Sequence, residues 1–137
     1  MNIPCIVESI ITRETKAFII FEDADFISFL DHRPVFYGHT LVCPKKHYAT
    51  LYDLPQELIQ PFFLLVQQIG KAVELGMSAM GSFIAMNNKV SQSVPHLHVH
   101  IIPRSKGDGL KGFFWPRLTY KEEEHMLEVQ QKIIQYL

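Results

Sequence analysis

The segment 95–104, PHLHVHIIPR, constrains the fold more than any other part of the chain. In it His96, His98 and His100 alternate with aliphatic residues. A β-strand places successive side chains on opposite faces. We therefore expect a strand whose aliphatic face packs on a core and whose imidazoles line the opposite, accessible face. Three histidines in strict alternation are rarely accidental, so the pattern indicates a functional site.

The remaining periodicity predicts an α+β fold. Strands are predicted from β-branched and aromatic residues between turn signals, at 16–21, 26–30, 39–42, 82–86 and 97–102. Apolar residues at helical spacing predict a long helix that is N-capped by Asp53, begins near Leu54 and ends at Gly76. Pro61 should kink or restart it, and residues 122–136 form a second, carboxyl-terminal helix. The order β-β-β-α-β-β-α predicts a mainly antiparallel five-stranded sheet.

Length and charge exclude several classes of protein. The 137 residues fit one domain spanning 1–137. A net charge of -1 provides no basic field for nucleic acid. No apolar run approaches the ~18–20 residues that span a bilayer, and the amino terminus lacks a secretory pattern. Cys5 and Cys43 cannot form a disulfide framework, so we expect a reducing, cytoplasmic location.

Two chemistries suit the alternating histidines. Two of them could share a zinc ion with a third ligand such as His47. The Cα atoms of His96 and His100 should lie ~13 Å apart on a strand, however, so all three could hardly bind one ion. The alternative is phosphorus chemistry, in which a neutral imidazole attacks phosphorus and neighbouring imidazoles hold its oxygens.

The segment HLHVHII resembles the signature of the histidine triad (HIT) superfamily of nucleotide hydrolases and transferases. The resemblance extends over residues 3–104. It includes the residues FLD at 29–31, the segment RPVFYGHTLVCPKKHY at 33–48, and Asn87 with the QSV that precedes the triad. It implies an α+β sheet with a long helix, usually paired into a homodimer, and cleavage of a nucleoside monophosphate from a leaving group at the α-phosphorus.

The resemblance also implies roles for the histidines. The middle one, His98, would be the nucleophile and form a nucleotidyl-imidazole intermediate that water hydrolyses. His100 would contact the α-phosphate or the bridging oxygen, and His96 would support the nucleophile. Ser93 would assist the leaving group or orient phosphate oxygens, as would Gln92.

Further positions resemble the nucleotide-binding residues of the family. Asp31 matches an acid that binds the ribose diol, since a carboxylate accepts two hydrogen bonds. Phe29, Val7 and Ile10 would form an apolar slot for the base. Asn87 would add a polar contact.

A zinc site is a further possibility raised by the resemblance. Many bacterial relatives carry a C-x-x-C near the amino terminus, but here the stretch is Cys5-Ile-Val-Glu8. A site of Cys5, Glu8, His47 and His96 is chemically possible, although the loss of one thiolate weakens it. We expect the reaction to require no cofactor bound by the protein. Mg²⁺ could accompany a polyphosphate substrate.

We expect a hydrolase of dinucleoside polyphosphates such as diadenosine tetraphosphate, because the long segment after the triad resembles that branch of the superfamily. The alternatives are a nucleoside phosphoramidase that cleaves AMP-amines, or a nucleotide-binding regulator with little turnover. The expected partners are a small nucleotide and a second copy of the chain, not a nucleic acid or a membrane.

Several features depart from the family pattern or add to it. The stretch NNKVSQ at 87–92 lacks the glycines that help a loop cradle phosphate. Lys45 and Lys46 could steer polyphosphates, and Arg104 could contact distal phosphates. The aromatic cluster Phe113-Phe-Trp115-Pro could cap the site, pack on a dimer partner or bind a second base.

Overall fold

A computed structural model describes residues 3–110 and 117–137. The aromatic cluster at 113–116 lies outside the described residues. The chain forms a five-stranded sheet in the order β1-β2-β3-β5-β4, and every neighbouring pair is antiparallel. The strands are, in chain order, β1 (Ile19–Glu22), β2 (Phe26–Leu30), β3 (Thr40–Pro44), β4 (Gly81–Ala85) and β5 (Val99–Arg104). The predicted α+β class is confirmed.

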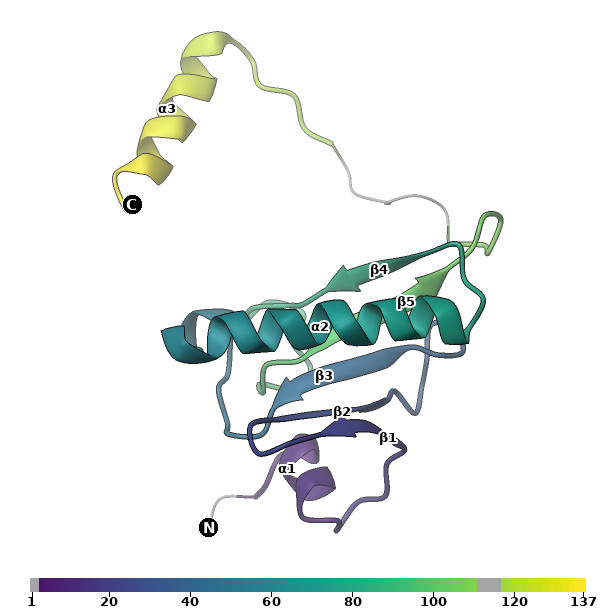
Figure 1. Ribbon diagram of the computed structural model, residues 1–137. Coiled ribbons are helices and arrows are strands. Elements are labelled where there is room, and N and C mark those ends of the chain that lie inside the picture. The colour runs from purple at the N-terminus through teal and green to yellow at the C-terminus, as the bar shows by residue number, and fades with distance from the viewer. Residues whose placement is uncertain (1–2, 111–116) are drawn as a thin grey trace.

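Helix α2 (Gln56–Gly76) lies across one face of the sheet (Figure 1). Its buried residues, among them Phe62 and Ile69, pack with Val99 and Ile101 of β5 in the larger of two core clusters. The aliphatic residues of the histidine-rich strand therefore face α2, as their alternation predicts. His100 projects from the other face of the same strand.

Helix α1 (Ile6–Ile11) is an element that the predicted order lacks. Its sequence, IVESII, is rich in β-branched residues, which lower helix propensity. A capping box starts it nonetheless: the Glu8 N–H donates to Cys5 Sγ, and the Cys5 N–H donates to the Glu8 carboxylate. Val7 and Ile10 then pack on Ile27 and other residues of the smaller core cluster.

The start of α2 differs from the prediction in two ways. Its N-cap is Pro55, and the Asp53 carboxylate instead accepts hydrogen bonds from the backbone and hydroxyl of Thr50. The short 3₁₀ helix Leu51–Asp53 lies between Thr50 and the N-cap Pro55. Helix α2 also continues through Pro61 without restarting. The proline lies in the second turn, so only one helical hydrogen bond lacks a donor.

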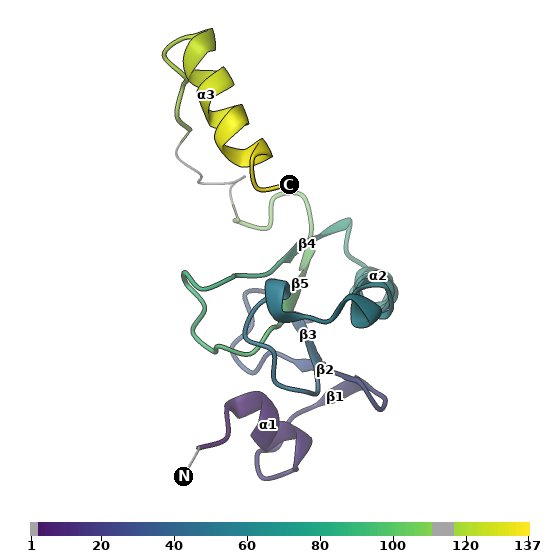
Figure 2. The same cartoon turned by 90° about the vertical axis from the view of Figure 1, so that its left-hand side faces the viewer.

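Helix α3 (Glu123–Ile134) has no buried residue. In both views it lies beyond the β4 edge of the sheet, at the opposite end of the molecule from α1 (Figures 1 and 2). Apolar side chains that include Met126 and Ile133 are half exposed on it. No helix among the described residues combines the length and apolar character needed to cross a bilayer.

Candidate active site

A cavity of about 610 Å³ opens between α1, β2 and the segment that enters β5. Its lining combines apolar side chains from α1, β2 and their neighbours with hydroxyl, carboxylate and imidazole groups. It brings together seven residues that the sequence nominates, namely Val7, Ile10, Phe29, Asp31, Ser93, His98 and His100. Such a mixed lining suits a ligand that carries both a flat apolar ring and a charged group.

The backbone sets the orientation of His98. Its Nδ1 atom lies 2.7 Å from the carbonyl oxygen of His96. A carbonyl oxygen can only accept, so Nδ1 carries the proton and donates. The neutral ring therefore keeps its lone pair on Nε2, which is the state that a nucleophilic imidazole needs.

A fourth histidine, His39, contacts the triad. The Val35 N–H donates to His39 Nδ1 over 3.1 Å, so the proton of the neutral ring lies on Nε2. That Nε2–H donates to His100 Nδ1 over 3.0 Å. His100 in turn carries its own proton on Nε2, where it can donate to an oxygen of a bound phosphate.

The electrostatics keep these two rings neutral. Burial lowers the pKa of His100 to about 4, with further lowering by His98 and His39 and an opposing effect of Asp31. Burial also lowers the pKa of His39, again against Asp31. At neutral pH each group in this chain of hydrogen bonds therefore donates toward His100: the Val35 N–H to His39, and the His39 Nε2–H to His100.

Sequence reasoning did not single out His39. It directly precedes β3, in which Leu41 is the register partner of His100. This strand pairing brings together residues that are 61 positions apart. The only sequence signal was its place in the GHTLVCPKKH segment, where it reads as the start of a strand.

Asp31 lies beside this chain of hydrogen bonds. Its Oδ1 atom accepts the Arg33 N–H at 2.9 Å, and its Oδ2 atom lies 3.7 Å from His39 Nε2. The ligand atoms of Asp31, His39 and His100 lie within 4.8 Å of one another, as in a metal site. A metal would need the His39 Nε2 lone pair, but the hydrogen bond from Val35 places a proton there. The geometry therefore favours proton sharing over metal binding.

A second group of donors lies on the other side of His98. Ligand atoms of Cys5, Glu8, His47 and His96 also lie within 4.8 Å of one another. Cys5 Sγ is 3.3 Å from His96 Nδ1, and His47 Nδ1 is 3.3 Å from a Glu8 oxygen. His96 Nε2 donates to the Pro44 carbonyl at 2.7 Å, which leaves its Nδ1 lone pair for a ligand. This donor set fits Zn²⁺.

His96 corrects one prediction. It is fully buried, whereas the alternation predicted three accessible imidazoles. The reason is that β5 begins at Val99, so His96 lies in the preceding turn and its ring points into the donor cluster. Its contact with His98 is made by the backbone carbonyl, which accepts the hydrogen bond from His98 Nδ1.

Comparison with known proteins agrees with this geometry. The model of the HIT domain family matches residues 12–107. The chain belongs to the HIT family. The protein named hit of Bacillus subtilis is 40% identical over 88% of this chain and 86% of its own length. Adenosine 5′-monophosphoramidase HNT1 of Saccharomyces cerevisiae is 33% identical over 85% and 72% respectively.

Solved HIT structures share the fold. A HIT family protein from Bacillus subtilis matches with a TM-score of 0.85, 34% identity and coverage of 97% of this chain and 96% of its own. A zinc-bound histidine triad family protein from Mycobacterium smegmatis matches with a TM-score of 0.72, 33% identity and 97% coverage of both chains. These similarities establish a nucleotide-binding, hydrolase-like family for this protein.

Besides His96, two residues to which the HIT resemblance gave roles, Gln92 and Asn87, do not line the cavity. The Gln92 amide donates to the Ala49 carbonyl and accepts the Lys89 N–H. Asn87 is exposed and donates to the Ser91 carbonyl at 3.3 Å. Both side chains shape the loop that precedes the histidine triad. That loop contains two non-glycine residues with positive φ, Lys89 at 72° and Ser91 at 59°, as expected of a tight loop without glycine.

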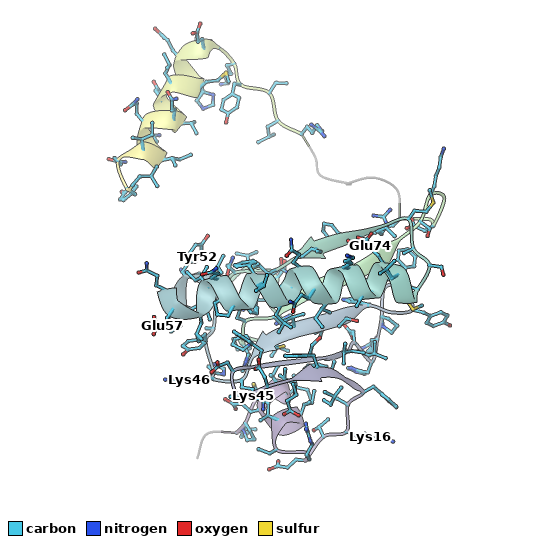
Figure 3. The ribbon with its side chains drawn as sticks, in the orientation of Figure 1. Lys16, Lys45, Lys46, Tyr52, Glu57 and Glu74 are labelled. Carbon is cyan, nitrogen blue, oxygen red and sulfur yellow. The ribbon has the colours of Figure 1, made fainter. Side chains whose placement is uncertain are left out.

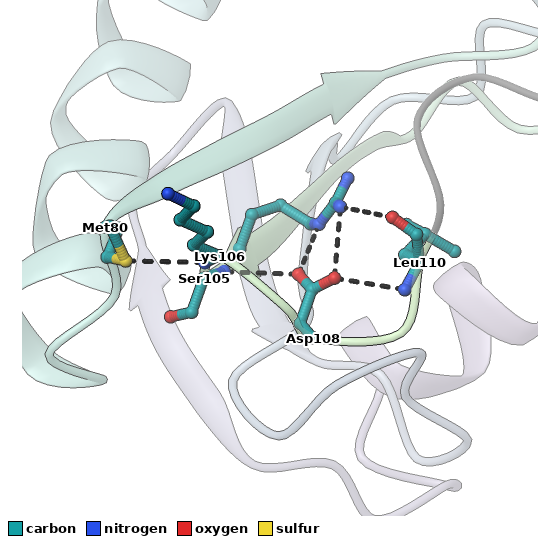
Figure 4. A network of polar contacts seen from close by, with 6 residues as sticks. Met80, Ser105, Lys106, Asp108 and Leu110 are labelled. Carbon is teal, nitrogen blue, oxygen red and sulfur yellow. Dashed lines mark hydrogen bonds and ion pairs between the residues drawn. The ribbon is translucent and has the colours of Figure 1, made fainter.

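Three basic residues that could contact phosphates, Lys45, Lys46 and Arg104, interact with other side chains outside the cavity. Lys45 pairs with Glu22 at 2.9 Å. Lys46 lies 5.9 Å from the centre of the Tyr48 ring, and its side chain extends away from the ribbon (Figure 3). Arg104 forms a bidentate ion pair with Asp108, and Figure 4 shows Asp108 within the network of polar contacts. This pair lowers the pKa of Asp108 to about 2 and fixes the turn after β5.

Proposed function

We propose that this protein cleaves nucleotides at the α-phosphorus through a covalent nucleotidyl-His98 intermediate. The observation that carries the proposal is the hydrogen bond from His98 Nδ1 to the His96 carbonyl, because it leaves Nε2 free for attack. In the first step Nε2 forms a bond to phosphorus and the bond to the leaving group breaks. In the second step water attacks phosphorus, the P–N bond to His98 breaks, and a nucleoside monophosphate leaves.

The other cavity residues assist these steps. The His100 Nε2–H stabilises negative charge on a phosphate oxygen. The Ser93 hydroxyl donates a hydrogen bond to the departing atom of the leaving group. Asp31 accepts hydrogen bonds from ribose hydroxyls, and the apolar slot of Val7, Ile10 and Phe29 holds the base.

We infer that phosphoramidates, in which the leaving group is an amine, are the preferred substrates. The similarity to the yeast adenosine 5′-monophosphoramidase supports this class. The sequence favours dinucleoside polyphosphates only through the segment after the triad. Its helix α3 lies beyond the β4 edge, far from α1 and its wall of the cavity (Figure 1). Dinucleoside polyphosphates are therefore the second candidate.

A side-by-side turnover assay tests both proposals. The purified chain is offered an AMP-amine phosphoramidate and diadenosine tetraphosphate, each with and without Mg²⁺. We expect faster release of AMP from the phosphoramidate and no turnover by His98→Ala. His125→Ala, on the exposed helix α3, is the matched control. Retained turnover in His98→Ala would refute the covalent mechanism. Binding of AMP without cleavage of either substrate would favour the regulator alternative.

We also propose that Cys5, Glu8, His47 and His96 bind a structural zinc ion. The convergent donor atoms support this proposal. When bound, zinc would supply a rigid cross-link rather than a reactive water, because four protein ligands complete its usual coordination. The cross-link would join α1, which forms the wall of the base slot, to the segment that carries His98.

We propose a homodimer and a cytoplasmic location as well. The edge strand β4, with the sequence GSFIA, carries no charge or proline that would block pairing with another strand. Helix α3, whose apolar side chains are exposed, lies on the same side of the molecule as β4 (Figure 1). Both cysteines are free thiols, which suits a reducing compartment. Light scattering on the purified chain measures the oligomeric state.

A further inference from the structure

Asp31 is placed to act on catalysis as well as on binding. It lines the cavity, and its side chain is 19% exposed, so a ligand hydroxyl can reach it. One of its oxygens already accepts the Arg33 N–H. The other lies 3.7 Å from His39 Nε2, which is too long for a strong hydrogen bond but close enough to attract its proton.

His39 is held firmly between Asp31 and His100. It is 3% exposed, and the Val35 N–H fixes its ring from the far side. The turn before it is also tightly packed. Gly38 has a φ of +96°, and a Cβ atom there would lie 2.5 Å from Met77 Cγ. The His39 ring therefore has little freedom to move away from either neighbour.

The single proton on His39 Nε2 has two acceptors within reach. It donates to His100 Nδ1 at 3.0 Å, while the Asp31 oxygen at 3.7 Å competes for it. A ribose hydroxyl that donates to this oxygen satisfies the carboxylate and weakens the competition. The His39 Nε2–H then donates to His100 Nδ1 without competition. This hydrogen bond holds the His100 ring with its own Nε2–H directed toward the phosphate.

We propose that Asp31, His39 and His100 form one coupled unit through which binding of the ribose hydroxyls orients His100 for catalysis. The inference rests on the proposed function. It makes His39 a positioning residue, and it makes ribonucleotides the preferred substrate class at the level of kcat. A nucleotide without the sugar hydroxyls binds, but His100 is less well oriented against its α-phosphate.

The test compares two substrates that differ only in the sugar. They are the 5′-phosphoramidates of adenosine and of 2′,3′-dideoxyadenosine with the same amine, measured at saturation so that kcat and KM separate. For the unaltered protein we expect kcat to be lower for the dideoxy substrate by a factor in the range of about 5–150, the usual size of a coupling between sites. A loss confined to KM would overturn the proposal.

Two substitutions at His39 sharpen the test. His39→Leu removes the shared proton, so kcat for the ribose substrate should fall to the dideoxy level and the ratio should approach one. His39→Gln keeps an N–H donor for His100 and should restore part of the ratio. His125→Leu, the matched substitution on α3, should leave both substrates unaffected. An unchanged ratio in His39→Leu would refute the coupling.

A further variant covers the case in which His39→Leu does not fold. Asp31→Asn keeps the size of the side chain but removes the carboxylate, and it should also bring the ratio close to one. The failure of the underlying function looks different, because the unaltered protein would then turn over neither substrate. Turnover of both with equal kcat would refute the coupling alone.

Discussion

Two groups of similar residues flank His98 and differ in what they can do. On one side Cys5, Glu8, His47 and His96 converge, and on the other Asp31, His39 and His100. Each group mixes imidazole with carboxylate, and each places its ligand atoms within 4.8 Å. Residue type and distance alone would assign a metal to both.

The backbone distinguishes them. In the first group a carbonyl oxygen accepts from His96 Nε2 and leaves the Nδ1 lone pair directed at the other donors. In the second group a backbone N–H donates to His39 Nδ1 and forces a proton onto Nε2, between the ring and its neighbours. A lone pair at the centre of a cluster favours a cation, and a proton there favours a hydrogen-bonded chain.

The largest expected effect comes from the ring between the two groups. His98→Ala should lower kcat on the order of 10⁴-fold or more, because it removes the nucleophile, while nucleotide affinity largely survives. His98→Asn, which keeps polarity, should be equally inactive. Turnover kinetics together with calorimetric titration of AMP check both statements. Substantial activity in His98→Asn would move the nucleophile to one of the flanking groups.

Metal binding should separate the two groups next. Cys5→Ser keeps an oxygen that can cap α1 but removes the thiolate, so zinc affinity should fall by about 100-fold or more. His39→Ala should leave zinc affinity unchanged. Competition with a chromophoric chelator measures both variants. Equal losses in the two variants would show that the groups are not chemically distinct.

A smaller effect, an increase in zinc affinity, is expected from a substitution in the first group. Glu8→Cys adds a second thiolate, and it should raise zinc affinity by about tenfold or more, where tenfold corresponds to about 1.4 kcal/mol. The melting temperature with zinc should rise relative to that of the unaltered protein, and the difference should vanish in excess chelator. A rise that persists in chelator would point to packing rather than to the metal.

The last prediction concerns the pH dependence of stability and the second group. Burial lowers the pKa of His100 to about 4, below its unfolded value near 6.5. Between these pH values the unfolded chain binds more protons than the folded chain. The contribution of His100 to the free energy of unfolding is therefore complete above pH 6.5 and is lost as the pH falls toward 4. The slope for one proton is at most about 1.4 kcal/mol per pH unit. Denaturant unfolding of the unaltered protein and of His100→Leu should show a shallower fall in the variant; an identical fall would contradict this pKa.

The fold followed from local pattern wherever the pattern was unambiguous. Strand β2 has the predicted bounds, and α2 ends at Gly76 as predicted. Helix α1 was missed because β-branched residues dominate its six positions, while its stability comes from the Cys5 cap and from tertiary packing. Short elements of this kind depend on contacts that sequence periodicity does not contain.

The sequence by itself determined the family resemblance, the face on which His98 and His100 lie, and the residues that could serve a base, a ribose and a phosphate. The face follows from a period of two, whereas the roles in binding follow from residues that match the motifs of the HIT family; both kinds of signal are local in the sequence. Only the tertiary structure decided that His39 joins His100, that His96 turns into a donor cluster, and which nitrogen of each ring carries its proton. These properties depend on hydrogen bonds between residues up to 91 positions apart. Local sequence patterns do not predict which distant residues come into contact.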